Sequence, residues 1–256
     1  MMRIVTLLLT SLICLSCTPQ DAVVTDDEQD SGITLNQTVI NLSSGNTLQI
    51  DARSEAPVTY QSQNPFIARV SVTGLVTAQH VGSTRVRLDN GSDTREITVN
   101  VNPVYNLYPD PILEFGITRT TLLQRLGTPD NETDEGFAYF NYSSAAPYVV
   151  YLFDENDRLE VAAVIVRTEY TTPLASHLAE RYQYYASDDE YYYFINALTL
   201  DDATIGIFLT LDNADYWQVM YLPFAETKTV TEKRHNHKTM TGKINAFTTQ
   251  MRAMQP

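Results

Sequence analysis

The stretch SQNPFIARVSVTGLVTAQHVGSTRV, residues 62–86, decides the fold of the first half of this 256-residue chain. Apolar and polar residues alternate along its short runs, which places successive side chains on opposite faces of a strand. Pro65 fixes its own φ angle and keeps Asn64 out of the helical region. Gly74 and Gly82 each follow an alternating run, where a tight turn needs a residue at positive φ. The stretch therefore predicts short antiparallel strands joined by tight turns.

The same alternation extends over residues 32–103, in runs that are bounded by Gly, Asn, Ser, Asp or Pro. The further runs are ITLNQTVINL, TLQIDA, VTYQSQ, TRVRLD and REITVNV. Short, regularly spaced strands with turn residues between them are typical of a β-sandwich. We therefore predict that residues 32–103 form a β-sandwich domain.

A set of residues in this segment resembles the bacterial immunoglobulin-like domain of group 2. The set is Asn64-Pro65, Ile67-Ala68, Val70, the run Gly74-Leu75-Val76-Thr77-Ala78, Gly82, Ile97, Val99 and Val101. Tyr60 stands where that family commonly has Trp, and it still offers a large ring to the core. Members of the family occur in surface adhesins and as spacers in extracellular enzymes. The resemblance implies a binder or a spacer without catalytic residues.

The amino-terminal stretch MMRIVTLLLTSLICLSC has the features of an export signal. Arg3 precedes an apolar run that is too short to span a bilayer as a helix. Ser16-Cys17 at its end resembles a bacterial lipobox, although Cys14 stands where that pattern usually has Leu. The resemblance implies a signal peptide over residues 1–16 and a lipid anchor on Cys17. An ordinary cleaved signal peptide and an uncleaved anchor are the alternatives.

A lipid-anchored chain of this kind belongs to the cell envelope, and we expect it at the outer membrane, facing the periplasm or the cell surface. Once Cys17 is lipidated and residues 1–16 are removed, no free thiol remains. The acidic, polar residues 17–31 are typical of a flexible tether. The sequence thus predicts a lipoprotein that is held away from the membrane.

The pattern changes after the Pro- and Tyr-rich segment 102–112, which predicts a domain boundary near residue 104. Thr118 can cap a helix that Gly127 and Pro129 would end. Three alternating or apolar runs then predict strands, namely FAYFNY, PYVVYLF and RLEVAAVIV.

The order of elements then repeats, which predicts a duplicated domain over residues 104–223 with repeats at about 112–167 and 170–223. Thr172-Pro173 opens a second predicted helix, LASHLAERYQYY, and YYYFINALTL, ATIGIFLTL and YWQVMYL follow as strands. The turn at Asp154 to Asp157 matches that at Asp212 to Asp215 at a constant spacing. We predict a mainly β, multi-domain chain, whose α+β domain has two helix-plus-three-strand repeats in one antiparallel sheet.

The first repeat resembles the SmpA/OmlA envelope lipoproteins and the related β-lactamase-inhibitor-like fold. The resemblance rests on Phe115-Gly116-Ile117-Thr118, Leu123, Leu126-Gly127, Pro129-Asp130 and the aromatic strand around Tyr139. The second repeat has Tyr184-Tyr185-Ala186 in place of the Leu-Gly-x-Pro signal and matches by element order alone. The resemblance implies protein binding, either in scaffolding of outer-membrane assembly or in clamping onto a partner enzyme.

The formal net charge of −14 argues against a nucleic-acid partner, because a phosphate-binding surface needs clustered Lys and Arg. All four lysines nevertheless lie after residue 227. Residues 224–256 therefore form a basic tail, which we expect to be either flexible or a loosely docked helix.

Histidines and acidic clusters are the candidates for chemistry, and none has a recognisable signature. We expect His80 in a solvated hairpin and His177 on a helix surface. His235 and His237 lack third and fourth metal ligands nearby. The acidic cluster at 154–157 puts Arg158 where a Ca²⁺ ligand is wanted, so we interpret such clusters as solvated turns. We therefore expect no enzyme, no metal and no cofactor.

Tyrosines are concentrated between residues 182 and 193, and exposed Tyr is typical of binding surfaces. We propose Tyr182, Tyr185, Tyr191 and Tyr193 as binding residues. Alternation places Tyr191 and Tyr193 on one side of a strand and Tyr192 on the other; packing of these rings in the core is the alternative. The sequence as a whole predicts a non-catalytic envelope lipoprotein that binds an envelope or extracellular protein in adhesion or scaffolding. The alternative is a glycan-binding accessory of a polysaccharide-uptake system.

Overall fold

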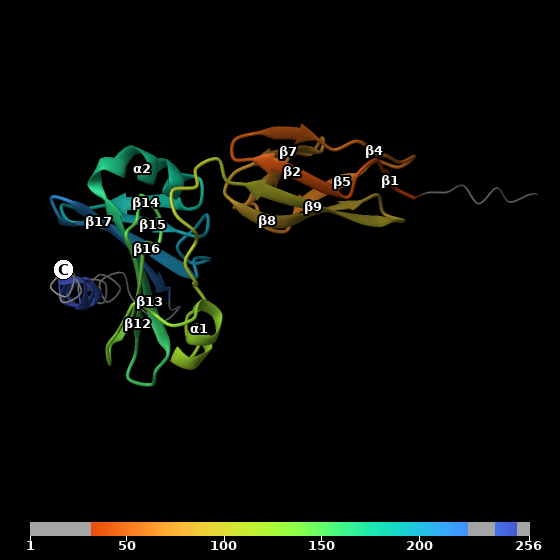
Figure 1. Cartoon of the computed structure of the whole chain (residues 1–256). Coiled ribbons are helices and arrows are strands. Elements are labelled where there is room, and N and C mark those ends of the chain that lie inside the picture. The colour runs from red at the N-terminus through yellow and green to blue at the C-terminus, as the bar shows by residue number, and fades with distance from the viewer. Residues whose placement is uncertain (1–31, 225–238, 250–256) are drawn as a thin grey trace, which may run out of the picture. The chain divides into compact units, whose positions relative to one another are not determined.

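A computed structural model of the chain describes residues 32–224 and 239–249 (Figure 1). Four features predicted from the sequence lie outside these residues. They are the signal peptide with Cys17, the acidic tether, the pair His235 and His237, and the parts of the basic tail at 225–238 and 250–256.

The strands predicted for the sandwich are confirmed. They are β1 (Thr34–Leu35), β2 (Val39–Ser43), β3 (Thr47–Gln49), β4 (Ala52–Arg53), β5 (Thr59–Ser62), β6 (Ala68–Val70), β7 (Leu75–Ala78), β8 (Gly82–Asp89) and β9 (Thr94–Asn102). They form a four-stranded sheet in the order β2-β9-β8-β5, a three-stranded sheet in the order β3-β7-β6 and the pair β1-β4. Their inward-facing apolar side chains, from Ile33 to Val101, form one core.

Gly74 shows why this sandwich depends on its turn residues. Gly74 has φ +82° and Gly82 has φ +149°, as the alternating pattern predicted. A Cβ atom on Gly74 would lie 2.9 Å from the ring of Tyr60, which packs against the core. A side chain at position 74 is therefore disfavoured by both the backbone and the neighbouring ring.

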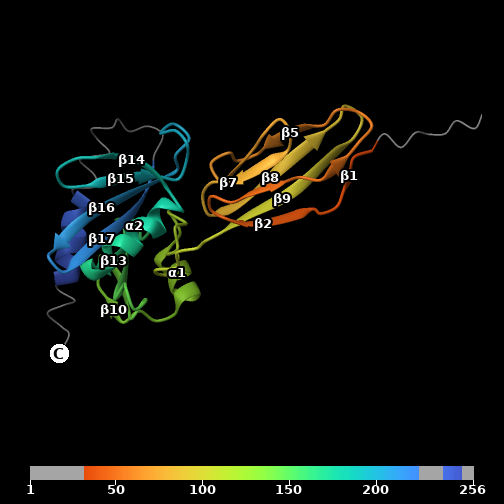
Figure 2. The same ribbon diagram turned by 90° about the horizontal axis from the view of Figure 1, so that it is seen from above.

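The second half of the chain forms one eight-stranded antiparallel sheet. Its strands are β10 (Asn131–Glu132), β11 (Gly136–Phe140), β12 (Tyr148–Phe153), β13 (Leu159–Arg167), β14 (Gln183–Ser187), β15 (Tyr192–Ile195), β16 (Ile205–Asn213) and β17 (Tyr216–Pro223). The order in the sheet is β10-β11-β12-β13-β17-β16-β15-β14 (Figure 2). Two four-stranded meanders thus meet at β13 and β17, which is the arrangement expected of two similar units placed side by side. Each unit has four strands, so the expectation of three missed the edge strands β10 and β14.

The helix α1 (Arg119–Leu126) begins and ends as predicted. The hydroxyl of Thr118 accepts the backbone N–H of Thr121, and Gly127 follows the helix at φ +81°. The helix α2 (Thr171–Ala179), which follows the short 3-10 turn η1 (Thr168–Tyr170), ends earlier than predicted. Its predicted last turn is strand β14 instead, because the Tyr-rich run there pairs with β15 and Tyr favours strands over helices.

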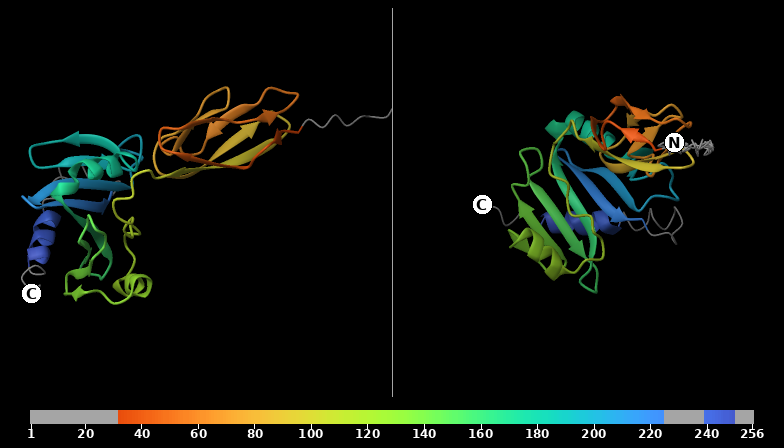
Figure 3. Two further views of the ribbon diagram at one scale, coloured as in Figure 1. Left: turned by 45° about the horizontal axis from the view of Figure 1, so that its top comes forward. Right: turned by 90° about the vertical axis from the view of Figure 1, so that its right-hand side faces the viewer.

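Both faces of the eight-stranded sheet are apolar, and each is covered by different elements. One face packs on α1, α2 and the segment 107–117 that leads into α1. The other packs on a helix at 239–249, which contributes Met240, Ile244 and Phe247 (Figure 3). Of the two expectations for the basic tail, the docked helix is therefore found at residues 239–249. No helix in the described ranges combines the length and apolar character needed to cross a bilayer.

Candidate binding groove

An open apolar groove lies on the sheet face that carries α2. It has a volume of about 340 Å³. Its walls are Thr171, Leu174 and Ala175 of α2, Tyr192 and Phe194 of β15, Leu209 of β16 and Trp217 of β17. Among the described residues of this wall, the side-chain polar groups are the hydroxyl of Thr171, the phenol of Tyr192 and the indole N–H of Trp217. The groove is suited to contact with another molecule rather than to proton transfer.

Strand register places the aromatic side chains in the groove. Tyr192 pairs with Leu209 across β15 and β16, and Leu211 pairs with Trp217 across β16 and β17. Because side chains alternate between faces, these four residues share the face on which α2 lies. The indole N–H of Trp217 donates a hydrogen bond of 2.7 Å to Thr171 Oγ1, which fixes the ring against the start of α2.

The rim of the groove exposes large apolar side chains. Tyr192 is 47% exposed, Leu211 is 52% exposed and Tyr184 is 50% exposed. The rings of Tyr192 and Trp217 meet edge to face at 6.5 Å, and those of Tyr184 and Phe194 do so at 5.7 Å. Such edge-to-face contacts hold the rings in place while their remaining surface stays accessible.

Three of the four tyrosines proposed from the sequence are buried. Tyr182 packs in the core under α2, and Tyr191 and Tyr193 pack in the core under the helix at 239–249. The hydroxyl of Tyr193 donates to Asp188 Oδ2 at 2.5 Å, and that of Tyr191 donates to a hydroxyl of that helix. These three rings are therefore not available to a ligand in this structure. Tyr185 is 50% exposed, and its role in binding stays a prediction.

Alternation correctly separates Tyr191 and Tyr193 from Tyr192, and of these three rings the exposed one, Tyr192, was not proposed. Sequence reasoning missed Tyr192, Phe194 and Trp217 because it had no sign that the helix at 239–249 covers the other face. One signal was available, since Trp217 is the only tryptophan of the chain and lies in the duplicated part.

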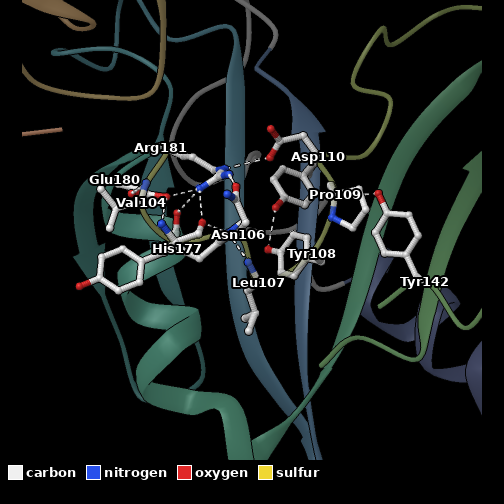
Figure 4. Close-up of polar contacts among 12 residues, drawn as sticks. Val104, Asn106, Leu107, Tyr108, Pro109, Asp110, Tyr142, His177, Glu180 and Arg181 are labelled. Carbon is white, nitrogen blue, oxygen red and sulfur yellow. Dashed lines mark hydrogen bonds and ion pairs between the residues drawn. The ribbon is translucent and has the colours of Figure 1, made fainter. Parts of the chain in front are cut away.

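His177 is fully buried, which corrects the expectation of a helix-surface residue (Figure 4). Its Nδ1 lies 3.1 Å from the carbonyl oxygen of Tyr105, and segment 104–110 covers it. Desolvation lowers the pKa of His177 to about 4, so the ring is neutral near pH 7. His80, predicted in a solvated hairpin, is half-buried and stacks on Phe66 with ring centroids 4.1 Å apart.

Glu180 and Arg181, at the end of α2, anchor the segment 104–110 (Figure 4). The Glu180 carboxylate accepts the backbone N–H groups of Val104 and Tyr105, each at 2.9 Å. The Arg181 guanidinium donates to the Tyr105 carbonyl oxygen at 3.0 Å and to Asp110 Oδ1 at 2.9 Å. Since these partners are mostly main-chain groups of one segment, the cluster acts as a clamp on that segment.

A buried pair of phenols extends this cluster under the segment. The hydroxyl groups of Tyr108 and Tyr221 lie 3.0 Å apart. Burial raises the pKa of both phenols, so both stay protonated and can share a hydrogen bond. The pair ties segment 104–110 to β17.

Within the described residues, no group of three or more His, Cys, Asp or Glu side chains is arranged to hold a metal ion. The first acidic turn has a structural use instead. Asp154 Oδ1 accepts the backbone N–H groups of Asn156 and Arg158, each at 2.9 Å, and so caps its own turn.

Comparison with known proteins identifies the segment that forms the sandwich. Residues 31–99 match the family of bacterial Ig-like domains (group 2). The predicted resemblance of this segment is thereby confirmed: the chain carries a bacterial Ig-like domain of group 2. No curated protein matches the chain.

Solved structures give low similarity. A mutant of intimin from EHEC O157:H7 is 18% identical, with a TM-score of 0.22, over 38% of this chain and 51% of that chain. Domains 5–6 of the S-layer protein SbsC are 13% identical, with a TM-score of 0.25, over 77% of this chain and 85% of that chain. The C-terminal domain of TagH is 10% identical, with a TM-score of 0.26, over 66% of this chain and 98% of that chain. The resemblance of the second half to SmpA/OmlA stays a prediction.

Proposed function

We propose that this chain is a non-catalytic binding protein of the bacterial cell envelope. The groove between α2 and β15 to β17 contacts the partner, and the Ig-like domain acts as a spacer between the membrane anchor and the groove. The observation that carries this proposal is the open groove of about 340 Å³, which has the exposed Tyr192 in its wall and the exposed Leu211 next to Trp217 on the neighbouring strand.

Exposed aromatic side chains lower the solubility of a protein. Clusters of such side chains on the surface of a folded protein therefore mark interaction sites. Tyr and Trp are the residue types that contribute most to binding energy at interfaces, since they offer large, stiff surfaces with one polar group. Tyr192 and Trp217 in the groove have this character, and Phe194 adds a third ring between α2 and the sheet edge.

Cellular location follows from the amino-terminal half. The predicted lipidation of Cys17 would anchor the chain to a membrane, and the acidic residues 18–31 would separate the anchor from the Ig-like domain. Bacterial Ig-like domains fit the spacer role because they form a stable sandwich without reactive groups. Adhesion or scaffolding at the envelope is the process that this arrangement serves.

The absence of catalysis is part of the proposal. An active site needs a nucleophile or base that is oriented by a third group within hydrogen-bond distance. The groove wall offers no carboxylate and no imidazole, and the buried groups around His177 hold a chain segment. A binding role is the simpler interpretation of both sites.

A photocrosslinking amino acid placed at Leu211 in the native host tests the proposal. We expect a discrete product that is lost when Tyr192→Ala is added. The matched control places the same amino acid at Val72, an apolar residue of the sandwich that is 91% exposed, and should give no such product. A product that resists proteases would identify a glycan and replace the protein partner. Equal products from positions 211 and 72, or none from 211, would contradict the proposal.

A further inference from the structure

The two repeats of the eight-stranded sheet share a turn with the same hydrogen bonds. In the β10–β11 turn, Thr133 Oγ1 accepts the backbone N–H groups two and three residues ahead, at 3.1 and 3.2 Å. In the β14–β15 turn, Asp188 Oδ1 accepts the corresponding groups at 3.0 and 2.9 Å. Thr133 and Asp188 are therefore equivalent positions, from which the other residues of the two repeats can be matched.

This match assigns the aromatic groove to a place that exists in both repeats. Phe137 lies four residues after Thr133, and Tyr192 lies four residues after Asp188. Phe153 lies at the end of β12, and Leu211 lies near the end of β16, each just before a hairpin turn. Each pairs with a residue of the following strand that lies on the same face of the sheet. These pairs are Phe153 with Leu159 and Leu211 with Trp217. Phe137 and Phe153 are thus the counterparts of Tyr192 and Leu211.

In the first repeat, the guanidinium group of Arg119 lies over these two counterparts, Phe137 and Phe153. Its Cζ lies 4.9 Å from the ring centroid of Phe137 and 4.5 Å from that of Phe153. Its Nε donates to Asp157 Oδ1 at 3.0 Å, and its other nitrogens donate to two carbonyl oxygens of the β10–β11 turn. Both rings are buried, with exposures of 0% and 6%.

Among the residues that the structure describes, the second repeat places a threonine, and no cation, at the equivalent position. The backbone N–H of Arg119 donates to the Asp157 carbonyl oxygen at 3.0 Å, and that of Thr168 donates to the Asp215 carbonyl oxygen at 2.9 Å. Thr168 therefore stands in place of Arg119, and its short side chain cannot cover the groove. The rings and apolar groups that Arg119 covers in the first repeat are about half exposed in the second.

We propose that the groove of the second repeat receives the guanidinium group of an arginine side chain from a partner protein. This inference rests on the proposed function and specifies the chemistry of its partner. A guanidinium group stacks on Tyr and Trp rings and keeps its charge at any physiological pH. The chain favours such a partner because its net charge is −14 and its lysines all lie beyond residue 227. Asp157, which accepts a hydrogen bond from Arg119, corresponds to Asp215 in the second repeat, so this position is an aspartate in both.

Trp217 provides a direct probe, because it is the only tryptophan of the chain and lines the groove. The full chain is titrated with acetyl-arginine amide while Trp217 fluorescence is recorded. The control ligand is acetyl-citrulline amide, which has nearly the same shape and no charge. We expect saturable binding of the arginine probe and at least about ten-fold weaker binding of the citrulline probe. Equal responses, or no response to arginine, would overturn the proposal.

A variant whose own side chain fills the groove gives the complementary test. Thr168→Arg supplies an internal guanidinium group in the manner of Arg119, so it should weaken binding of acetyl-arginine amide at least about ten-fold. Thr172→Arg, at an exposed position of α2 outside the groove wall, adds the same charge and should leave binding unchanged. Equal effects of the two substitutions would mean that net charge, and not the groove, governs binding.

The photocrosslink from position 211 separates failure of this inference from failure of the proposed function. If acetyl-arginine amide competes with the crosslink and the citrulline probe does not, both stand. If the crosslink forms but neither probe competes, the groove binds its partner through other chemistry and the arginine proposal falls alone. If the full chain responds to arginine only after Lys228, Lys233, Arg234 and Lys238 are changed to Gln, the chain's own basic segment is the occupant, which overturns an external partner.

Discussion

The guanidinium group of Arg119 lies 4.5 Å from the ring centroid of Phe153 and covers that ring, whereas Leu211, the counterpart of Phe153, is about half exposed. The side chains of Phe137 and Phe153 are thus buried in the first repeat, and their counterparts Tyr192 and Leu211 are about half exposed in the second. The residues at the matching backbone position are Arg119 in the first repeat and Thr168, whose side chain is shorter, in the second.

Arg119→Ala should destabilise the chain by about 2 kcal/mol, because it removes two cation–π contacts and the hydrogen bonds to the β10–β11 turn. Urea unfolding measures the change. Arg125→Ala is the matched control, since Arg125 makes a salt bridge with Glu114 at the surface and should matter by less than about 0.5 kcal/mol. Equal losses for the two variants would mean that Arg119 does not stabilise the first repeat as described.

Glu180→Gln should release the segment that precedes the second sheet. The substitution weakens the two hydrogen bonds to the N–H groups of Val104 and Tyr105, and it leaves the buried Arg181 guanidinium with less compensation. We expect faster amide hydrogen exchange at Val104 and Tyr105. Glu169→Gln, at an exposed position of η1, should leave both rates unchanged. Unchanged rates in Glu180→Gln would show that the clamp does not hold the segment.

His177 should make stability depend on pH. Its pKa is about 4 in the folded chain and about 6.5 in an unfolded chain, so its contribution is fully present above about pH 6.5. As pH falls from 6.5 toward 4, the unfolded chain binds a proton that the native chain does not, and stability falls by roughly 1.4 kcal/mol per pH unit. His177→Asn should remove this slope. His80, whose pKa is also lowered, is the same in both proteins, so the difference between their slopes reports on His177 alone. Parallel slopes would contradict its neutral, buried state.

Alanine substitutions at two glycines of the sandwich distinguish the cost of backbone strain from the cost of steric overlap. Gly45 and Gly74 both have φ +82°, but a Cβ on Gly45 meets nothing within 4 Å, whereas one on Gly74 meets the Tyr60 ring. Gly45→Ala should cost about 1 kcal/mol from the backbone alone, and Gly74→Ala should cost about 1 kcal/mol more. Thermal unfolding of both variants measures the difference. Equal costs would mean that Tyr60 moves aside freely.

Local sequence patterns sufficed for the sandwich, the capped helix α1 and the repeat of elements. Alternation and positive-φ glycines define strands and turns within a few residues, and Thr118 with Gly127 delimits α1 by hydrogen bonds to its own ends. Such features need no knowledge of distant contacts. The end of α2 was wrong because pairing of β14 with β15, a tertiary contact, overrides the helical spacing of apolar residues there.

The candidate site required long-range information. Tyr191 and Tyr193 were proposed as binding residues, with packing in the core as the alternative, and the helix at 239–249 covers their face of the sheet. His177 was expected at the surface, yet segment 104–110 folds over it. In both cases the covering element lies far away in the sequence. Comparison of Arg119 with Thr168 also needed the hydrogen-bond pattern, because the two repeats differ in length before their helices.

The most direct test of the open groove is a set of intermolecular nuclear Overhauser effects between acetyl-arginine amide and the full chain. The account predicts contacts from the arginine side-chain protons to the rings of Tyr192 and Trp217, and none to Phe137 or Phe153, which Arg119 already covers. Contacts at the first repeat, or contacts that are absent from Tyr192 and Trp217 at saturating probe, would contradict it.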